Sequence, residues 1–229
     1  MDKVLIAVKS CWRYRDRRDA CRKTWVPVAR RWATVRFYVG MHAPQAPFAA
    51  PCSSLYGEQD VFSFPLHDDF KNIAPKIRRI MLDAVLDGFN KVVVVDDDTY
   101  IVSERLQKEI ESTEGSEYIG LLRTGPNGYG DKPYMQGSCY IINSKAIALL
   151  ASDKQFLVDG IPDDVAVGLV LLDKVISVNL PRRFWVGPIA KFIGRDDDFV
   201  STHKCNPEQM LACHAAWNRV CKNYPNFVV

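Results

Sequence analysis

The 229-residue sequence has no long uninterrupted apolar stretch. Its first apolar run covers residues 4–8 and is followed at once by Lys9. Such a run is too short for a membrane span or for the apolar region of a secretory signal. The sequence therefore predicts a chain without a membrane span, acting in the cytoplasm as a bacterial or viral protein would.

A strong excess of one charge is also lacking, since the formal net charge is +3 and charged residues make up 25%. This mildly basic balance does not by itself indicate nucleic-acid binding, and the charge content is unlike that of a disordered chain. Hydrophobic residues reach 48%, enough for a sizeable core. No internal repeat is present, so we expect one domain over residues 1–229.

The seven cysteines include no C-x-x-C pair, and this spacing argues against a zinc site. Free thiols in a reducing compartment are the simplest interpretation. The alternative is one or two disulfides, either Cys11–Cys21 or a pair among Cys205, Cys213 and Cys221.

What the sequence does contain is an alternation of strand and helix patterns. Short, branched apolar runs predict buried strands at 3–8, 35–39 and 91–95. Apolar residues at spacings of three and four predict a helix over 72–87, ended by Gly88. Further strands are expected at 61–64, 118–122, 139–142 and 175–178, and further helices within 13–31 and at 103–112 (capped by Ser103), 144–151, 164–172 and 207–221. This order predicts an α/β fold, a mostly parallel twisted sheet flanked by helices.

Three consecutive carboxylates, Asp96, Asp97 and Asp98, end the valine-rich strand over 91–95. Ligands of parallel sheets bind at the carboxyl ends of strands, and a divalent cation relieves the repulsion among these groups. Oxygen ligands suit Mg²⁺ or Mn²⁺. In extended chain Asp96 and Asp98 point to one side. One of them is suited to a metal and the other to ribose hydroxyls, whereas a solvated acidic turn is the alternative.

A second acidic pair, Asp163-Asp164, precedes a predicted helix. One of these carboxylates is a candidate general base held at the helix N-terminus. The competing interpretation is a helix cap. His203, in a polar stretch, is either a further metal ligand or a lone surface histidine.

Several segments in order resemble glycosyltransferase family 31, the fringe and β-1,3-glycosyltransferase group. Arg22-Lys23-Thr24-Trp25 is similar to the family's R-x-T-W opening, and the acidic triplet matches its DDD. The remaining similar segments are 37–40 (F-x-x-G), Asp69-Phe70 with Asn72, Ile73 and Lys76, Pro133-Tyr134-x-x-Gly137-x-Cys139-Tyr140, and Pro162-Asp163-Asp164-Val165-x-x-Gly168. The resemblance spans about residues 4–205 and leaves 41–59 without a motif.

The resemblance implies a Rossmann-like GT-A fold and a UDP-sugar donor. It also implies Mn²⁺ (or Mg²⁺), inversion at the anomeric carbon and transfer to a hydroxyl of a glycan or other acceptor, with a β-1,3 linkage as one expected product. It divides the chain into a nucleotide-binding half, 1–100, and an acceptor half, 101–229. Golgi members carry an anchor and stem, so a Golgi lumen location is the alternative to the cytoplasm if this chain is trimmed.

Carried over by position, the resemblance implies that Asp98 binds the metal with His203 as a further contact. It implies that Asp96, next to Asp97, contacts the nucleoside or ribose, and that Asp164 is the catalytic base. The remaining candidates are Arg18 and Arg22 toward the phosphates, and Tyr134, Gly137, Asp163 and Trp185 on the acceptor side. A solvated helix face for the arginines and core packing for the aromatic residues are the alternatives.

Three other functions fit parts of the pattern. The basic stretch 13–31 suits a sugar transferase acting on modified DNA bases. The two acidic clusters suit a metal-dependent phosphoryl-transfer enzyme or nuclease, provided that the carboxylates lie close together. A non-catalytic carbohydrate-binding module on the same fold is the third.

Overall fold

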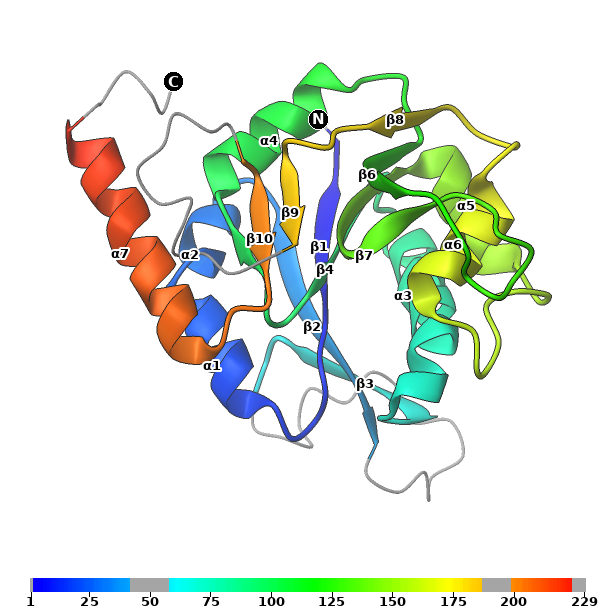
Figure 1. Ribbon diagram of the computed structural model, residues 1–229. Helices are drawn as coiled ribbons and strands as arrows, with labels where there is room; N and C mark the ends of the chain where they lie inside the picture. The colour runs from blue at the N-terminus through cyan, green and yellow to red at the C-terminus, as the bar shows by residue number, and fades with distance from the viewer. Residues whose placement is uncertain (1, 42–57, 187–198, 224–229) are drawn as a thin grey trace.

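The computed structural model describes residues 2–41, 58–186 and 199–223 (Figure 1). Its described strands form a seven-stranded sheet in the order β3-β2-β1-β4-β7-β6-β8 and a three-stranded sheet in the order β5-β10-β9. The strands are β1 Val4–Lys9, β2 Thr34–Met41, β3 Val61–His67, β4 Lys91–Asp96, β5 Tyr100–Ile101, β6 Tyr118–Arg123, β7 Tyr134–Asn143, β8 Ser177–Asn179, β9 Phe184–Val186 and β10 Ser201–His203.

The large sheet is mixed but mostly parallel, as predicted. The pairs β1–β2, β1–β4, β2–β3 and β6–β8 run parallel, whereas β7 runs antiparallel to both β4 and β6. The sequence indicated a strand at 139–142, but not its direction or its earlier start at Tyr134. The small sheet of β5, β9 and β10 was not predicted.

Helices cover both faces of the large sheet (Figure 1). One face carries α3, α5 and α6, and the other carries α1, α2, α4 and α7. The helices are α1 Arg15–Lys23, α2 Val26–Ala29, the 3₁₀ turn η1 Phe70–Asn72, α3 Ile73–Leu86, α4 Ser103–Ser112, α5 Ser144–Ser152, α6 Asp163–Leu171 and α7 Pro207–Asn223. None of these helices is long and apolar enough to cross a membrane.

The two covered faces explain the continuous apolar runs. In β1, Ile6 and Val8 belong to the core on the α1 side, and Leu5 and Ala7 belong to the core on the α3 side. Successive side chains of a strand point to opposite faces, so both sets must be apolar when both faces are buried.

The two predicted helix caps have different outcomes. Ser103 begins α4, but its side chain makes no cap bond and instead accepts a hydrogen bond from the indole N–H of Trp32. α6 begins at Asp163, and the cap position is held by Pro162, which makes no side-chain cap bond. Asp164 nevertheless accepts a hydrogen bond from the amide of Val165 in the first turn of this helix, so it satisfies one free amide as the capping interpretation predicted.

The described cysteines, namely Cys11, Cys21, Cys139, Cys205, Cys213 and Cys221, carry free thiols, as the simpler interpretation predicted. The seventh, Cys52, lies outside the described residues.

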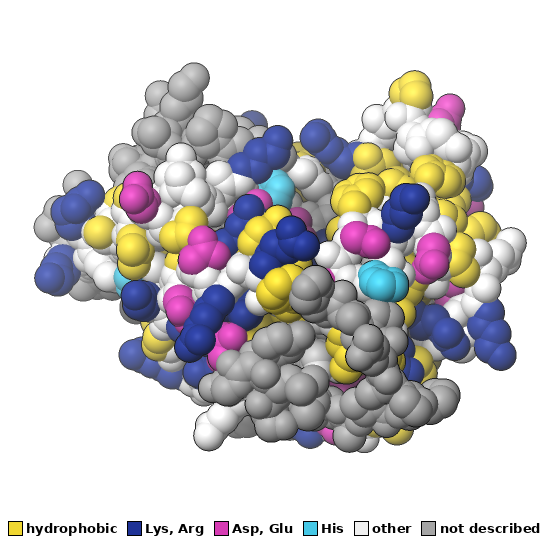
Figure 2. All heavy atoms as spheres, turned by 90° about the horizontal axis from the view of Figure 1, so that it is seen from below, with side chains coloured by type: hydrophobic (Ala, Val, Ile, Leu, Met, Phe, Trp, Pro, Cys, Tyr) yellow, Lys and Arg dark blue, Asp and Glu magenta, His cyan; other side chains and the backbone are white. Residues whose placement is uncertain are grey.

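The carboxyl ends of β1 and β4 lie side by side, because these parallel strands pair in a register that sets Lys9 opposite Asp96. This edge of the sheet faces downward in Figure 1 and toward the reader in Figure 2, where acidic and basic side chains lie close together. The candidate site is built at this edge.

Candidate active site

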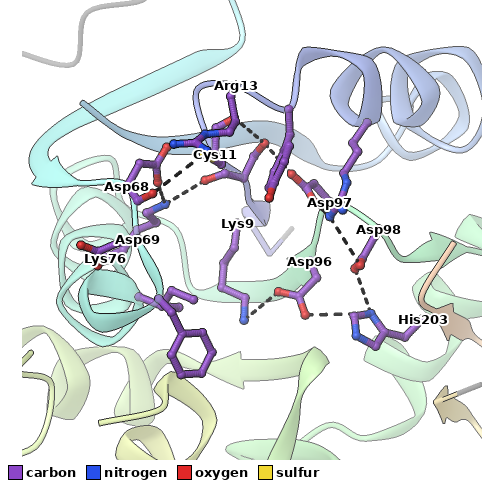
Figure 3. Close-up of a pocket in the computed structure, with 15 residues that line it drawn as sticks. Lys9, Cys11, Arg13, Asp68, Asp69, Lys76, Asp96, Asp97, Asp98 and His203 are labelled. Atoms are coloured by element: carbon purple, nitrogen blue, oxygen red, sulfur yellow. Dashed lines mark hydrogen bonds and ion pairs between the residues drawn. The ribbon is translucent and has the colours of Figure 1, made fainter. Parts of the chain in front are cut away.

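A cavity of about 580 Å³ opens beside the acidic triplet (Figure 3). The end of β1 and the start of α1 form one wall, and the segment from Asp68 through η1 to α3 forms another. Its lining residues are Lys9, Ser10, Cys11, Arg13, Tyr14, Arg17, Asp68, Asp69, Phe70, Ile73, Lys76, Asp96, Asp97, Asp98 and His203.

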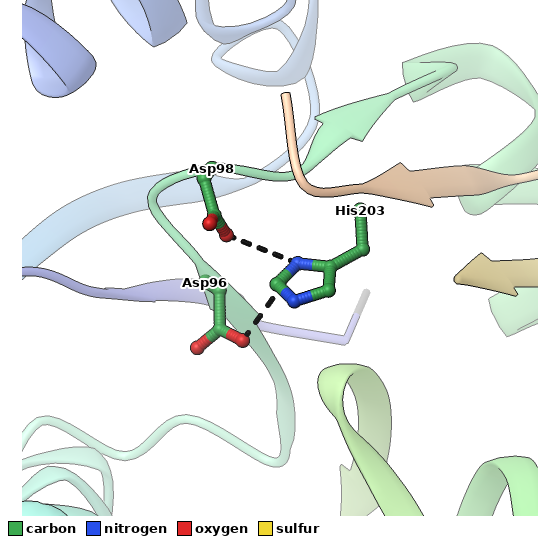
Figure 4. A group of neighbouring side chains, drawn as sticks. All are labelled: Asp96, Asp98 and His203. Atoms are coloured by element: carbon green, nitrogen blue, oxygen red, sulfur yellow. Dashed lines mark ion pairs between the residues drawn. The ribbon is translucent and has the colours of Figure 1, made fainter. Parts of the chain in front are cut away.

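Asp96, Asp98 and His203 form a compact group with metal-ligating chemistry (Figure 4). Each contributes one ligand atom, and these atoms lie within 4.8 Å of one another. The Nδ1 atom of His203 lies 3.0 Å from Asp98 Oδ1 and 4.0 Å from Asp96 Oδ2. Strand β10 supplies the histidine because it pairs with β5, which directly follows the triplet.

The second oxygen of each carboxylate faces a basic side chain. Asp96 Oδ1 lies 2.9 Å from Lys9 Nζ, and Asp98 Oδ2 lies 3.5 Å from a guanidinium nitrogen of Arg17. Burial alone would raise the pKa of Asp98, but the hydrogen bond and charge of His203, together with Arg17, lower it below its ordinary value. In each carboxylate the other oxygen is the one nearer His203 Nδ1.

This donor set fits a divalent cation that accepts both oxygen and nitrogen. Carboxylate oxygens suit Mg²⁺ and Mn²⁺ alike, and imidazole is a ligand of transition metals. Three protein ligands also leave positions for substrate oxygens and water.

Asp97 points away from this group. It is buried, accepts a hydrogen bond from Ser10 Oγ at 2.7 Å, and accepts another from Arg17 at 3.1 Å. Burial raises the pKa of Asp97 to about 6, against the opposing effects of Ser10 and Arg17. The predicted alternation of the triplet is therefore present, and Asp97 fixes the end of β1 and the start of α1.

The second acidic pair reaches the same centre through Lys9. Lys9 Nζ lies 2.5 Å from Asp163 Oδ2 and donates to the carbonyl of Gly137 at 3.0 Å. The amide of Gly137 in turn donates to Asp164 Oδ2 at 3.1 Å. The two acidic clusters, far apart in sequence, are thus joined by the side chain of Lys9 and the backbone of Gly137.

Asp164 has an environment unlike that of Asp163. Burial and the charge of Asp163 raise the pKa of Asp164, while Lys9 and the amides of Gly137 and Val165 act in the opposite direction. Asp164 is not among the residues that line the cavity, but a carboxylate with a raised pKa is suited to accept a proton.

Among the other acceptor-side candidates, the structure describes the side chain of Tyr134 but not that of Trp185. Tyr134 begins β7 beside this pair, where partial burial and the charge of Asp164 raise the pKa of its phenol. The close approach of α6 to β7 requires glycine at 168, because a Cβ there would lie 2.6 Å from the Cβ of Tyr134. Trp185 belongs to β9, but its side chain lies outside what the structure describes.

The two arginines chosen from the sequence do not line the cavity. Arg18 is fully buried and holds Glu58 through two nitrogens, at 3.2 and 2.9 Å. Arg22 pairs with Glu58 and Asp60, each at 2.6 Å. Because Arg18 is buried against Glu58, it does not lie on a solvated helix face, which was the alternative for it. Both arginines instead hold acidic side chains within the fold.

Sequence reasoning missed Arg17 and Lys9, which reach the triplet and are the lysine and arginine side chains that pair with it among the described residues. Arg17 lines the cavity and stacks over the ring of Tyr14 at 4.3 Å, with about a third of its side chain exposed. A signal for Lys9 existed, because a charged residue directly after a buried apolar strand marks the edge of the sheet where ligands bind.

The family model described as galactosyltransferase matches residues 16–131, just over half of the chain. Among solved structures, a glycosyltransferase involved in the glycosylation of the major capsid of PBCV-1 has a TM-score of 0.56 at 11% identity, covering 93% of this chain and 99% of its own. An active-site mutant of LgtC has a TM-score of 0.50 at 12% identity, covering 93% and 95%. These likenesses show the fold, which is of the predicted GT-A type. A comparison with curated protein sequences found no significant match.

Proposed function

The chain belongs to the galactosyltransferase family, and from this premise we propose that it moves a sugar from a UDP-sugar to a hydroxyl of a glycan or other acceptor, with inversion at the anomeric carbon. The observation that carries the proposal is the junction at Lys9. One ammonium group contacts both Asp96 of the metal-ligating group and Asp163, the neighbour of the proposed base. This contact links the proposed cation-binding group to the helix that carries the proposed base.

Asp98, His203 and Asp96 would hold the cation, Mn²⁺ or Mg²⁺. When bound, the cation offsets the negative charge that develops on a diphosphate leaving group. Asp96 thus joins the metal group here, whereas the family resemblance alone assigned it to the ribose. Arg17, rather than Arg18 or Arg22, is placed to contact the diphosphate, because its guanidinium reaches the cavity beside Asp97 and Asp98.

Asp164 would accept the proton of the acceptor hydroxyl while that oxygen attacks the anomeric carbon from the face opposite the diphosphate. A single displacement with one base gives inversion. Tyr134, Gly137 and Asp163 surround this carboxylate and form the acceptor side. The family resemblance favours a β-1,3 linkage, with residues 1–100 forming the donor half and 101–229 the acceptor half.

Two alternative functions fit the geometry less well. A two-metal phosphoryl-transfer site needs both acidic clusters as ligands. Here Asp163 is held by Lys9, and the described residues provide a single group of three metal-ligating side chains. A sugar transferase acting on DNA would use the basic stretch 13–31, but Arg18, Arg22 and Arg30 are engaged with Glu58 or Asp60.

A panel of UDP-sugars with Mn²⁺, scored for UDP release, tests the reaction class before any acceptor is known. We expect release from one donor and its loss on addition of EDTA. Incubation with DNA and RNA is the control for the nuclease alternative, and no nucleotide should be released in it. Failure of every UDP-sugar to bind would overturn the proposal, and donor binding without turnover would favour the carbohydrate-binding alternative.

Substitution of the neighbouring arginines by methionine should separate donor binding from folding. Arg17→Met removes a charged contact to the diphosphate, worth about 1.5–3 kcal/mol, so the KM for the donor should rise by roughly 10- to 100-fold with little change in melting temperature. Arg18→Met removes one of the two arginines that hold the buried Glu58, since Arg22 remains, and should cost about 1.5–3 kcal/mol of stability. Donor kinetics and thermal unfolding of both variants check this. An unchanged donor KM in Arg17→Met would remove Arg17 from the donor site.

A further inference from the structure

We infer that Lys9 is a positioning residue: its ammonium group holds Asp96 and Asp163 in fixed places, which leaves Asp164 as the carboxylate of the helix pair that accepts a proton. This inference rests on the proposed function, in which Asp164 is the base. It assigns a task to a buried lysine that no motif marked.

The three contacts of Lys9 use its full donor capacity. Its Nζ lies 2.9 Å from Asp96 Oδ1, 2.5 Å from Asp163 Oδ2 and 3.0 Å from the carbonyl oxygen of Gly137. An ammonium group has three donors, so these partners direct all of them. The side chain is only 7% exposed, and a buried charge of this kind persists only when it is paired and hydrogen-bonded.

The placement of Lys9 follows from the sheet. Lys9 is the last residue of β1 and pairs in register with Asp96, the last residue of β4. Gly137 lies in β7, which is the other neighbour of β4. Asp163 begins α6, which packs against β7. A side chain at the end of β1 can therefore bridge the metal-ligating group and the helix pair.

The same arrangement makes the two carboxylates of the pair unequal. Asp163 faces the positive charge of Lys9 directly. Asp164 instead accepts hydrogen bonds from the backbone amides of Gly137 and Val165, at 3.1 and 2.9 Å. These donors are neutral. When two adjacent carboxylates compete for a proton, the one that lacks the direct cation takes it more readily. The contacts of Lys9 thus select Asp164 over Asp163.

The electrostatic balance agrees with this selection. Burial would lower the pKa of Lys9, but the charges of Asp163 and Asp96 outweigh burial and raise it, so the ammonium stays charged. For Asp164, burial and Asp163 raise the pKa, and Lys9 lowers it. Tyrosines of the neighbouring strands also face the pair, and their raised pKa values keep them neutral: Tyr118, Tyr134 and Tyr140. Removal of the Lys9 charge should therefore raise the pKa of Asp164.

The test is the pH dependence of Lys9→Met. In this variant, the acid limb of kcat/KM for sugar transfer should move to higher pH by about 1–3 units, the range that one nearby charge produces. Turnover should therefore fall at neutral pH and recover in more alkaline buffer. Lys9→Arg keeps the charge, and its limb should lie close to that of the wild type. Lys91→Met is the matched control, because Lys91 pairs with Asp2 at the opposite end of the same sheet.

A second measurement does not depend on activity. The carboxyl ¹³C resonance of Asp164, identified by its absence in Asp164→Asn, should titrate at higher pH in Lys9→Met than in the wild type. If Lys9→Met does not fold, Lys9→Met/Asp163→Asn removes both members of the buried pair, and its Asp164 resonance should titrate close to the wild-type position. Titration of Asp164 at the wild-type pH in folded Lys9→Met would overturn the inference. Lack of turnover with every donor would instead count against the proposed function, and the resonance would still decide the role of Lys9.

Discussion

Asp164→Asn should bind the donor and the cation as the wild type does, yet lose sugar transfer by about 10²–10⁴-fold, the usual contribution of a general base. The amide has the shape of the carboxylate, and its oxygen can still accept from a backbone amide such as that of Gly137 or Val165. It cannot take a proton at neutral pH. Transfer kinetics, with calorimetric titration of the donor, measure both effects.

Asp173→Asn is the matched control for this change. Asp173 follows the same helix, its side chain is 80% exposed, and it adopts a positive φ of 73° that asparagine tolerates well. Transfer by this variant should equal that of the wild type. Normal turnover by Asp164→Asn would exclude Asp164 as the base, and loss of donor binding would indicate a structural role instead.

Much of the fold was visible in the sequence because burial on both faces leaves a simple pattern. The apolar runs of β1 and β4 and the three- and four-residue spacing of α3 each predicted an element at the observed place. The direction of β7 was not visible, since a buried strand has the same composition whether it runs parallel or antiparallel. The strands β5, β9 and β10 have two or three residues each and are too short to show any periodicity.

The acidic members of the site were easier to predict than the basic ones. The runs of adjacent aspartates at 96–98 and 163–164 are visible in the sequence, as are those at 68–69 and 196–198, whereas the choice of arginines that pair with the first triplet depends on how α1 is rotated. Arg18 and Arg22 lie four residues apart, share one helix face, and both meet Glu58. Arg17 is adjacent to Arg18 in sequence but lies on a different face, which turns it toward Asp97 and Asp98. Sequence order alone cannot tell these faces apart.

The close contact at Gly168 shows why a weak motif still carried information. A side chain at this position would meet the carbonyl oxygen of Pro133 at 2.9 Å as well as the Cβ of Tyr134. Glycine therefore lets α6 approach β7, and that approach brings Asp164 to the amide of Gly137. The spacing between the acidic pair and the glycine reflects a packing requirement that places the proposed base.

Loss of the metal-ligating group should have the other large effect. Asp98→Ala and His203→Ala each remove one of three proposed ligands, so Mn²⁺ binding should weaken. UDP release should fall by on the order of 10³-fold, because the cation contributes several kcal/mol to transition-state stabilisation. Manganese binding is measurable by electron paramagnetic resonance without any donor, which separates the loss of the ion from the loss of turnover.

His214→Ala serves as the control for the histidine. His214 lies on α7, half-buried beside the hydroxyl of Tyr100, and does not line the cavity. Its removal should leave manganese affinity and turnover unchanged. His203 reaches the triplet through the pairing of β10 with β5. A normal manganese affinity in His203→Ala would therefore mean that the cation is held by the carboxylates of β4 and the following turn alone. The small sheet would then have a purely structural role.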